Sequence, residues 1–504
     1  MKSLDTYVEE IEKTIQTARV TVKTEEIGFV KEVKDGVALL TGLDNVAYGE
    51  LVEFESGVKG YVIDLTPSDV GVIILGDYLK LQSGEQAKAL GYTLSVPVSN
   101  TIIGRVVDSL GVPQDGKSRI KTDTFYPIEK IAPGVVRRRP VNSSLLTGIK
   151  AIDSLIPIGR GQRELIIGDR GTGKTTIVVD TILNQKGQDV ICIYCAIGQK
   201  NAKTASLVNL LKTKGAFEYT IVVNASASES AAMQYLAPYA ACAIGEYFMD
   251  KGKDVLVIYD DLSKHAWAYR QLSLILRRPA GREAYPGDVF YLHSRLLERA
   301  CRLDEKYGGG SLTALPIIET LEGDLSAYIP TNVISITDGQ IFLEIDLFNA
   351  GIRPAINVGL SVSRVGGNAQ SKAMKQIAGK LKLDLAQYRA LAAFSQFESD
   401  LDEETKKFLN RGAKITQILK QKKNRPYNLA EEVAIIWSAT NGYLDTLSQT
   451  QIEQFEGKLL DLLNTKEKQW ITKINKQRVL SPDDEEGLKK IVKRVLDYQL
   501  TGTK

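Results

Sequence analysis

The chain has 504 residues, of which 43% are hydrophobic and 25% charged, and its formal net charge is +3. This length exceeds what one hydrophobic core usually supports, so we expect about three domains. The small net charge argues against nucleic acid as the main partner, and no apolar run reaches the roughly 18 residues of a membrane-spanning helix.

The first 25 residues form a predicted N-terminal extension. Acidic and basic residues mix throughout residues 1–16, a composition typical of neither a signal peptide nor a transit peptide. We therefore expect the chain to remain in a cytoplasm-like compartment. Apolar residues at helical spacing predict a short helix in residues 1–25, namely Leu4, Val8, Ile11 and Ile15.

Three domains are predicted beyond this extension, giving an α/β multidomain fold. Residues 26–94 contain short strand-like runs between turn residues, including the hairpin dipeptide Asp35-Gly36, and predict a β-barrel. In residues 95–370 apolar strands alternate with helical stretches, which indicates a parallel, helix-covered sheet. Residues 371–504 show helical spacing alone, so this C-terminal domain should be α-helical. The clearest strand-like runs of the sheet domain are 165–167, 190–197, 219–223, 255–259 and 311–318.

Residues 168–175 read GDRGTGKT and match the phosphate-binding pattern G-x-x-x-x-G-K-[ST] at every position. An apolar run of strand length precedes the pattern and a helical run follows it, so it sits in the setting of a P-loop in a RecA-like domain. Backbone N–H groups of such a loop and the following helix N-terminus attract an anion. Lys174 would meet the outer phosphates, and the Thr175 hydroxyl suits Mg²⁺. The alternative is a glycine-rich turn that binds nothing. The predicted nucleotide contacts in this segment are Asp169, Arg170, Gly171, Thr172, Gly173, Lys174, Thr175 and Thr176.

A second element of a nucleotide site follows the strand-like run 255–259. The run ends in Asp260 and Asp261, and an acidic residue at such a strand end holds Mg²⁺ in P-loop NTPases. We expect Asp260 to join Thr175 around Mg²⁺, usually through water. A helix cap after a core strand is the alternative interpretation.

Hydrolysis would also need a group that orients or deprotonates the attacking water. Gln199 stands after a neighbouring strand, where a carboxylate would be suitable, and an amide cannot accept the proton. These residues favour a site that holds a nucleotide and cleaves it poorly, unless Asp261, Glu283 or another carboxylate reaches it in the fold.

Three further residues are candidates for a function, although no specific motif surrounds them: Arg364, Cys192 and Cys195. Arg364 lies between serines and glycines, where it could enter a neighbour's phosphate site as an arginine finger or simply be solvated. The two cysteines form C-x-x-C, but strand residues three apart face opposite sides of a sheet, so we predict buried core thiols.

Several long stretches of the chain resemble the alpha subunit of the F-type ATP synthase, essentially from end to end. The alpha subunit is favoured over the catalytic beta subunit, which has glutamate at the position of Gln199. The stretches that carry the resemblance are residues 42–46, 147–175, 255–270, 277–300, 327–344 and 353–367.

The resemblance implies a rotary ATPase that couples ATP synthesis or hydrolysis to ion transport across a membrane. Three alpha and three beta subunits would alternate around a central stalk gamma subunit, with a peripheral stalk or delta subunit, and no nucleic acid. The alpha subunit would hold ATP or ADP with Mg²⁺ without turning it over. Arg364 matches the arginine lent to the adjacent beta subunit, and Arg353, Pro354 and Gln421 match positions near the base. The chain would lie on the cytoplasmic face of a bacterial inner membrane, or its organellar equivalent, and reach the membrane only through the ion-translocating sector.

Three departures from this family pattern bear on the nucleotide site. Gly171 stands where relatives generally have glutamine, and Lys423 stands where many have a second glutamine beyond Gln421. Residues 198–204 read GQKNAKT and diverge from the usual serine-threonine-valine after Lys200. Two other functions compete with the alpha-subunit interpretation: a self-sufficient hexameric NTPase motor, and a scaffold that binds no nucleotide.

Overall fold

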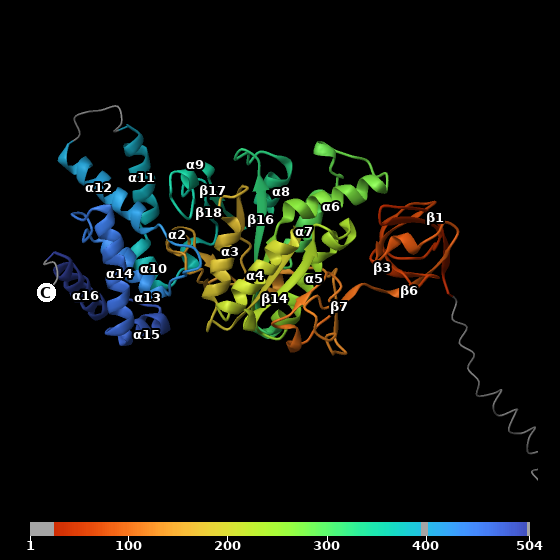
Figure 1. Ribbon diagram of the computed structural model, residues 1–504, viewed down its shortest axis with the longest axis horizontal. Helices are drawn as coiled ribbons and strands as arrows, with labels where there is room; N and C mark the ends of the chain where they lie inside the picture. Colours follow the sequence, from red (N-terminus) through yellow and green to blue (C-terminus); the bar gives the residue numbers. More distant parts are fainter. Residues whose placement is uncertain (1–24, 395–401, 501–504) are drawn as a thin grey trace, which may run out of the picture. The chain divides into compact units, whose positions relative to one another are not determined.

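The computed structural model describes residues 25–394 and 402–500 (Figure 1). The chain divides into two compact units, of which one ends at Leu94 and the other begins at Ser95. The helix predicted near the N-terminus lies outside the described residues. Among the helices in the described ranges, none combines the length and the apolarity needed to cross a bilayer.

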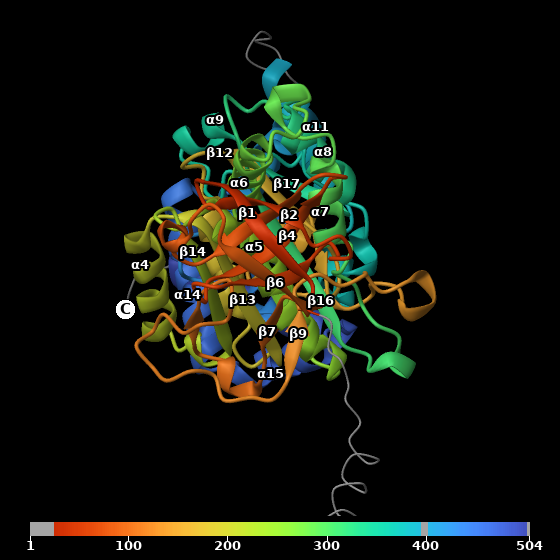
Figure 2. The same cartoon turned by 90° about the vertical axis from the view of Figure 1, so that its right-hand side faces the viewer.

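The first unit is a closed barrel of six antiparallel strands, as predicted (Figure 2). The Asp35-Gly36 hairpin is confirmed, because Lys34 pairs with Val37 across it and both turn residues have positive φ, as a two-residue hairpin turn requires. Apolar side chains of alternate residues, Val30 and Val72 among them, fill the barrel. In spatial order the strands are β1 (Ile27–Lys34), β2 (Val37–Gly42), β5 (Val70–Leu75), β4 (Lys59–Leu65), β3 (Glu50–Phe54) and β6 (Gln86–Thr93).

The second unit contains an eight-stranded sheet, in which only the pairing of the two strands at one edge is antiparallel. All five predicted strands are present. Three strands at or near the edges were not predicted: two of them have only two residues and so no periodicity, and the third, of five residues, has no motif beside it. In spatial order the strands are β18 (Val362–Ser363), β17 (Gly339–Leu343), β12 (Leu165–Asp169), β16 (Ser311–Thr320), β15 (Asp254–Asp260), β13 (Val190–Gln199), β14 (Thr220–Ser226) and β8 (Val106–Val107).

Helices cover both faces of this sheet, which explains why its central strands are apolar on both sides. On one face, α3 (Lys174–Asn184) and α4 (Asn201–Thr213) share a core with Cys192. On the other face, α5 (Ala231–Asp250) packs against Ile193, and α6 (Leu262–Ile275) packs against α5. Cys192 and Cys195 are fully buried free thiols, as predicted.

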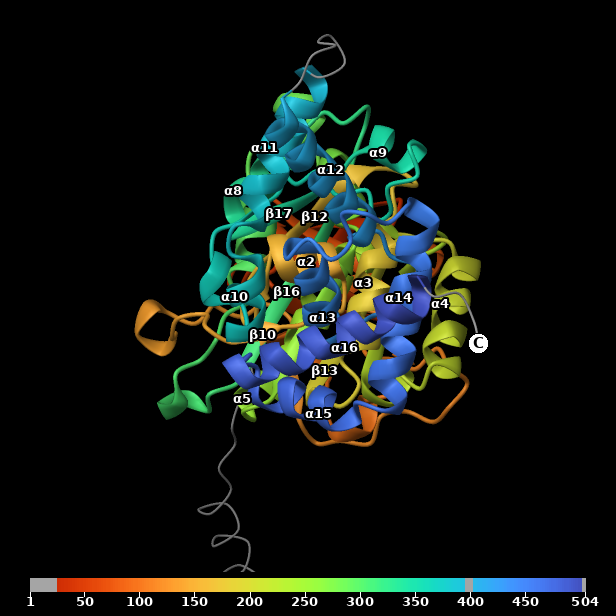
Figure 3. The same ribbon diagram turned by 90° about the vertical axis from the view of Figure 1, so that its left-hand side faces the viewer.

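Helices at the end of the chain complete the second unit, and their apolar faces join the core that contains α3 and α4 (Figure 3). The last helix begins at Pro482 after Ser481, with three acidic residues in its first turn, as favoured at a helix start. The helices of this region are α10 (Lys372–Ala378), α11 (Leu381–Phe394), α12 (Glu403–Ile418), α13 (Leu429–Thr440), α14 (Gln449–Thr465), α15 (Lys468–Gln477) and α16 (Pro482–Leu500).

Shorter elements connect the sheet, its helices and the C-terminal region. The buried Lys150 of α2 donates to Glu456 Oε1 of α14 at 2.6 Å, which ties the helical region to the sheet domain. The remaining elements are β7 (Ser95–Pro97), β9 (Phe125–Pro127), β10 (Ser144–Leu145), α2 (Lys150–Leu155), β11 (Ile158–Gly159), α7 (Val289–Leu297), α8 (Tyr328–Ile336) and α9 (Ile345–Asn349).

Candidate functional site

The phosphate loop connects β12 to α3 at the carboxyl edge of the parallel sheet. A Cβ at Gly168 would lie 2.4 Å from the carbonyl oxygen of Leu343, so a glycine is needed where β12 passes β17. Gly173 is the N-cap of α3 and offers no side chain to the first turn. The N–H groups at this helix start are therefore left for a ligand, which is the usual basis of anion binding at such a position.

Two cavities border the loop, with volumes of about 480 and 560 Å³. We call them the first and second cavity. Gly171, Gly173 and Thr176 line both. The loop backbone thus separates two spaces that one extended ligand could occupy together.

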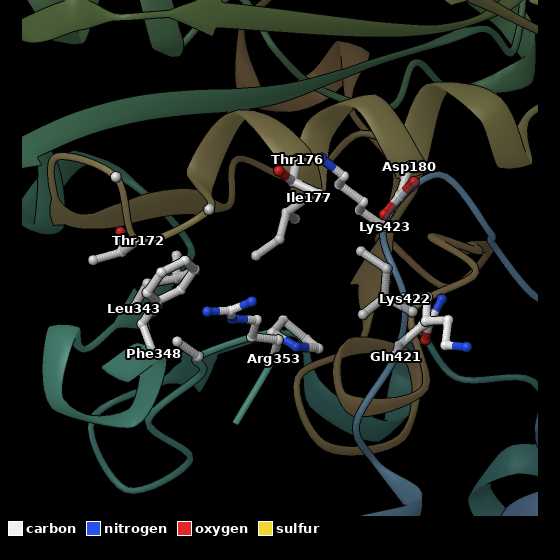
Figure 4. A pocket seen from close by; sticks show the side chains of 15 residues that line it. Thr172, Thr176, Ile177, Asp180, Leu343, Phe348, Arg353, Gln421, Lys422 and Lys423 are labelled. Atoms are coloured by element: carbon white, nitrogen blue, oxygen red, sulfur yellow. The ribbon is translucent and has the colours of Figure 1, made fainter. Parts of the chain in front are cut away.

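The first cavity has an apolar side that suits a flat ring, and polar and charged side chains line the rest of it (Figure 4). Ile177 of α3 faces Leu343 and Phe348 across it. The Arg353 guanidinium carbon lies 4.3 Å from the centre of the Phe348 ring, and Pro354 follows in the wall. The structure therefore brings Arg353 and Pro354 beside Thr172 and the rest of the phosphate loop.

Gln421 lines the same cavity from the segment after α12. Its Nε2 donates to the carbonyl oxygens of Gly148 (2.7 Å) and Arg425 (3.0 Å), and its Oε1 accepts from the Lys150 N–H (3.1 Å). Both amide hydrogens are thus committed to backbone, so Gln421 holds the wall in place. Lys422 and Lys423 line the cavity as well, with Lys423 near Asp180 and Thr176 (Figure 4).

The second cavity contains the loop cation. Lys174 is 8% exposed, and its Nζ donates to the carbonyl oxygens of Gly168 and Asp169, both at 2.6 Å. Burial lowers the pKa of Lys174, while nearby carboxylates, first Glu319, oppose that shift. In this conformation the lysine closes the loop upon itself and is close to the space that a phosphate would enter.

The two residues at the start of the loop point in different directions. Arg170 lines the second cavity. Asp169 turns its side chain away, because its Oδ1 accepts from Thr320 Oγ1 (2.6 Å) and from the Gly323 N–H (2.9 Å). Any contact of Asp169 with a ligand would therefore involve its backbone.

Asp260 ends β15 in the second cavity and is 2% exposed. Its Oδ2 accepts from Tyr194 OH (2.5 Å) and from Thr175 Oγ1 (3.0 Å), and its Oδ1 accepts from Gln199 Nε2 (2.7 Å). The structure thus brings the two predicted metal ligands into contact. Burial, and then the charge of Asp260, raise the pKa of Tyr194 well above its ordinary value, so this phenol remains a donor.

Asp261 has the helix-capping role that was considered for its neighbour. Its Oδ1 accepts from the Lys264 N–H (2.9 Å) at the start of α6, and its Oδ2 accepts from Lys264 Nζ (2.7 Å). The peptide bond between Asp260 and Asp261 is cis. Asp261 thus caps α6, while the adjacent Asp260 contacts Thr175.

Gln199 forms a bridge at the end of β13. Its Nε2 donates to Asp260, and its Oε1 accepts from Lys203 Nζ at 3.1 Å. The opposite amide orientation would place an NH₂ group against an ammonium group, so both neighbours determine this one. Gln199 is occupied on both sides and cannot act as a base.

Several residues of the second cavity were not expected from the sequence, notably Lys203, Glu319 and Trp267. Glu319 stands at the end of the predicted strand 311–318, so the rule that named Asp260 applies to it equally. Lys203 carries no comparable pattern. Glu283, considered as a possible base, lines neither cavity and instead accepts the Tyr328 N–H at 3.2 Å.

Arg364 lies on the segment after β18, at the edge of the sheet, and lines neither cavity. Its backbone N–H donates to the Asp338 carbonyl oxygen at 2.8 Å, which anchors the segment. The side chain is exposed. Among the described residues, its guanidinium group makes no hydrogen bond or ion pair, and its charge acts on the buried Glu164, where it opposes the rise in pKa that burial causes.

Comparisons with known proteins cover most of the chain. Residues 23–91 match the beta-barrel domain of the ATP synthase alpha/beta family, residues 148–363 match its nucleotide-binding domain, and residues 370–495 match the C terminal domain of the ATP synthase alpha/beta chain. Three curated relatives named ATP synthase subunit alpha come from the BAV1, CBDB1 and 195 strains of Dehalococcoides mccartyi. Each is 58% identical over 480 residues, which is 95% of either chain. The chain therefore belongs to the ATP synthase alpha/beta family, and within it to the alpha subunits.

Proposed function

We propose that this alpha subunit binds ATP or ADP with Mg²⁺ at its own phosphate loop without hydrolysing it, and that Arg364 completes the catalytic site of a neighbouring beta subunit. The observation that carries the first half is the state of Gln199. This amide is held between Asp260 and Lys203 at the position where a base would be useful. Its chemistry and its contacts both argue against proton transfer.

The two cavities support an arrangement for the nucleotide. The first cavity would take the base between the apolar wall and the Arg353–Phe348 pair. The loop N–H groups, Arg170 and Lys174 would meet the phosphates in the second cavity, with Thr172 and Thr176 alongside. Gln421 would act by holding the wall, and Asp169 through its backbone.

Thr175 and Asp260 are the residues that would hold Mg²⁺. Both offer hard oxygen ligands, and their contact at 3.0 Å shows that they reach the same space. No group of three or more His, Cys, Asp or Glu residues in the described ranges is arranged to hold a metal ion. Water and phosphate oxygens would therefore supply most of the ligands, as Mg²⁺ commonly requires. Bound there, Mg²⁺ would neutralise phosphate charge.

The position of Arg364 supports the second half of the proposal. An exposed arginine beside glycines, outside both cavities of its own chain, is available to a phosphoryl group held by another subunit. A guanidinium group delivered to a developing phosphoryl transition state contributes on the order of several kcal/mol. The charge would then act only in the assembled complex.

The finer features of the assembly belong to the same proposal. The catalytic beta subunit would alternate with this chain around the gamma subunit, with a peripheral stalk or delta subunit attached, on the cytoplasmic face of a bacterial inner membrane or its organellar equivalent. We also propose domain boundaries at 26–94, 95–370 and 371–504. The division between Leu94 and Ser95 and the family match that starts at residue 370 support them.

Purified chain alone tests the nucleotide half. We expect ATP binding by calorimetry and almost no phosphate release, with Lys174→Met as the blank for contaminating ATPase. Brisk hydrolysis that Lys174→Met abolishes would identify a self-sufficient NTPase, and Glu319 would be the first carboxylate to test. Absence of ATP binding would reject the nucleotide half and favour a scaffold that binds no nucleotide of its own.

A further inference from the structure

Lys203 lies where the two proposed oxygen ligands of Mg²⁺ meet. Its Nζ is 3.3 Å from Thr175 Oγ1, 3.6 Å from Asp260 Oδ2 and 3.1 Å from Gln199 Oε1. A hydroxyl, a carboxylate and an amide oxygen thus surround one ammonium group. Oxygen ligands of these kinds also suit a hard divalent cation. The lysine and the metal would therefore compete for the same oxygen atoms.

Lys203 reaches this place from the first turn of α4, and its side chain is 46% exposed. A long, half-exposed lysine on a helix surface loses few packing contacts when it changes rotamer. The ammonium group can therefore occupy the space beside Thr175 and Asp260 or swing away from it.

The other cations that line the second cavity are placed differently. Lys264 is paired with Asp261, and Lys174 is bonded to loop carbonyls. Within the described residues, Lys203 is the one cation at ion-pair distance from Asp260. The lining as a whole has more cations (Arg170, Lys174, Lys200, Lys203 and Lys264) than carboxylates (Asp260, Asp261 and Glu319).

We propose that Lys203 serves as a built-in cation of this site, taking the place of Mg²⁺ beside Asp260 so that the site holds a nucleoside triphosphate with little dependence on Mg²⁺. The proposal rests on nucleotide binding at this loop, as proposed above. A metal-free triphosphate brings several negative charges towards Asp260, and the ammonium group neutralises that carboxylate. When Mg²⁺ enters, it must displace the lysine, so its contribution to nucleotide affinity is reduced.

This competition predicts two opposite changes when the lysine is removed. In Lys203→Thr, ATP binding should weaken without Mg²⁺, because Asp260 is no longer neutralised, and Mg²⁺ should bind more tightly with ATP. The ratio of ATP affinity with Mg²⁺ to ATP affinity without it should therefore rise about tenfold. This factor corresponds to an interaction energy between that of a fully exposed ion pair and that of an ion pair at low dielectric.

Calorimetric titration of the full isolated chain with ATP, in excess MgCl₂ and in EDTA, measures this ratio. Lys203→Met removes the charge but keeps a side chain of similar length. It therefore controls for the loss of packing contacts in Lys203→Thr. Lys212→Thr removes the same charge from the far end of α4 and should leave the ratio unchanged. Circular dichroism and thermal unfolding confirm that each variant is folded. Mn²⁺ binding to the ATP-loaded chain, followed by electron paramagnetic resonance, should tighten in Lys203→Thr and Lys203→Met only.

Each outcome decides between distinct possibilities. An unchanged ratio in both Lys203 variants overturns the proposal, as does an equal loss of ATP affinity in both buffers, which would make Lys203 an ordinary phosphate ligand. Wild-type chain that binds no ATP in either buffer overturns the proposed function itself. Binding with a strong Mg²⁺ dependence in the wild type leaves the proposed function intact and rejects only the role of Lys203.

Discussion

Asp260 and Arg364 are both charged groups of the sheet domain, and their surroundings differ completely. The Asp260 carboxylate is buried, and three side chains donate hydrogen bonds to it. The Arg364 guanidinium is exposed and, among the described residues, has no hydrogen-bond or ion-pair partner. This contrast agrees with our proposal that Asp260 serves a ligand of its own chain and Arg364 a group outside it.

This difference indicates where each half of the chemistry takes place. A buried charge must be partnered within the fold, because desolvation without compensation is expensive. Such a network is preorganised for binding, and it occupies both Asp260 and Gln199. An exposed arginine costs the isolated chain little, and it becomes valuable when another subunit buries it beside phosphate. Variants of the exposed arginine and variants of the buried site can each test this comparison.

The largest expected effect is that of Arg364→Lys in the assembled ATP synthase. Steady-state ATP hydrolysis should fall by about a thousandfold or more, because lysine keeps the charge but lacks the planar, forked donor geometry. ATP affinity of the isolated chain should not change. Arg119→Lys, another exposed arginine of the same unit, is the control and should hydrolyse normally. Near-normal turnover in an assembled Arg364→Lys complex would rule out the finger role.

Lys174→Met tests the buried nucleotide site, because Lys174 lines the same cavity as Asp260. Removing a charged donor from the phosphate site should weaken ATP binding by the isolated chain about 10- to 100-fold. Thermal stability should change little, because the cost of the buried ammonium group is lost together with its hydrogen bonds to the Gly168 and Asp169 carbonyl oxygens. Fluorescent-nucleotide titration and thermal unfolding measure the two effects. Unaltered affinity would show that the loop does not bind phosphate through Lys174.

Glu432 of α13 shows what happens to a buried carboxyl that faces another acid. Burial, and then the neighbouring Asp153, raise the pKa of Glu432 well above its ordinary value, and Lys150 opposes the shift. The folded state thus keeps a proton that the unfolded state releases above its ordinary pKa. The contribution to stability is fully present below about pH 4.5 and is lost as pH rises towards the folded pKa.

Glu432→Gln removes this titration while retaining a group that can donate to Asp153. We expect the variant to be more stable than the wild type by about 1–3 kcal/mol at pH 8, with a flatter dependence of stability on pH. Urea unfolding across the pH range measures both. Glu453→Gln, an exposed residue of α14, should leave the slope unchanged. A destabilised Glu432→Gln variant at pH 8 would mean that the carboxyl is ionised and needed.

The smallest expected effect concerns Gly171, between the two cavities. Its φ is +86°, a conformation that disfavours any side chain, although a Cβ there would meet no atom within 4 Å. Gly171→Ala should therefore weaken ATP binding by about 1 kcal/mol, or roughly fivefold, through backbone strain alone. Gly457→Ala, in the middle of α14 and equally unobstructed, should instead stabilise the chain by about 0.5–1 kcal/mol. Tighter ATP binding in Gly171→Ala would show that the loop changes conformation when it is occupied.

Sequence patterns predicted those parts of the fold that depend on neighbours along the chain. The five predicted strands were evident because both sheet faces are covered, so their apolar runs are continuous. The edge strands β8 and β18 were missed because two residues carry no pattern, and β17 was missed although it is as long as β12, because no motif follows it as the phosphate loop follows β12. At the site, the segment GDRGTGKT and the acidic end of β15 are local features of the sequence. Each of them predicted site residues, and the fold places those residues around the same cavity.

Other features of the site could not be read from the sequence. Lys203 lies in the helix after β13, and its approach to Asp260 follows from the pairing of β13 with β15 in the sheet. The sequence could suggest that Gln199 is no base, but it could not show that its amide bridges Asp260 and Lys203.

The sequence alone determined the family resemblance, the domain classes and the position of the phosphate loop, because strand runs, glycine turns and helix starts are set by short-range sterics and periodic burial. Only the tertiary structure decided which charges face one another: that Lys203 enters the oxygen cluster of Asp260, and that Arg364 remains exposed. Electrostatic energy depends on distances of a few ångströms between groups far apart in sequence, and folding alone sets those distances.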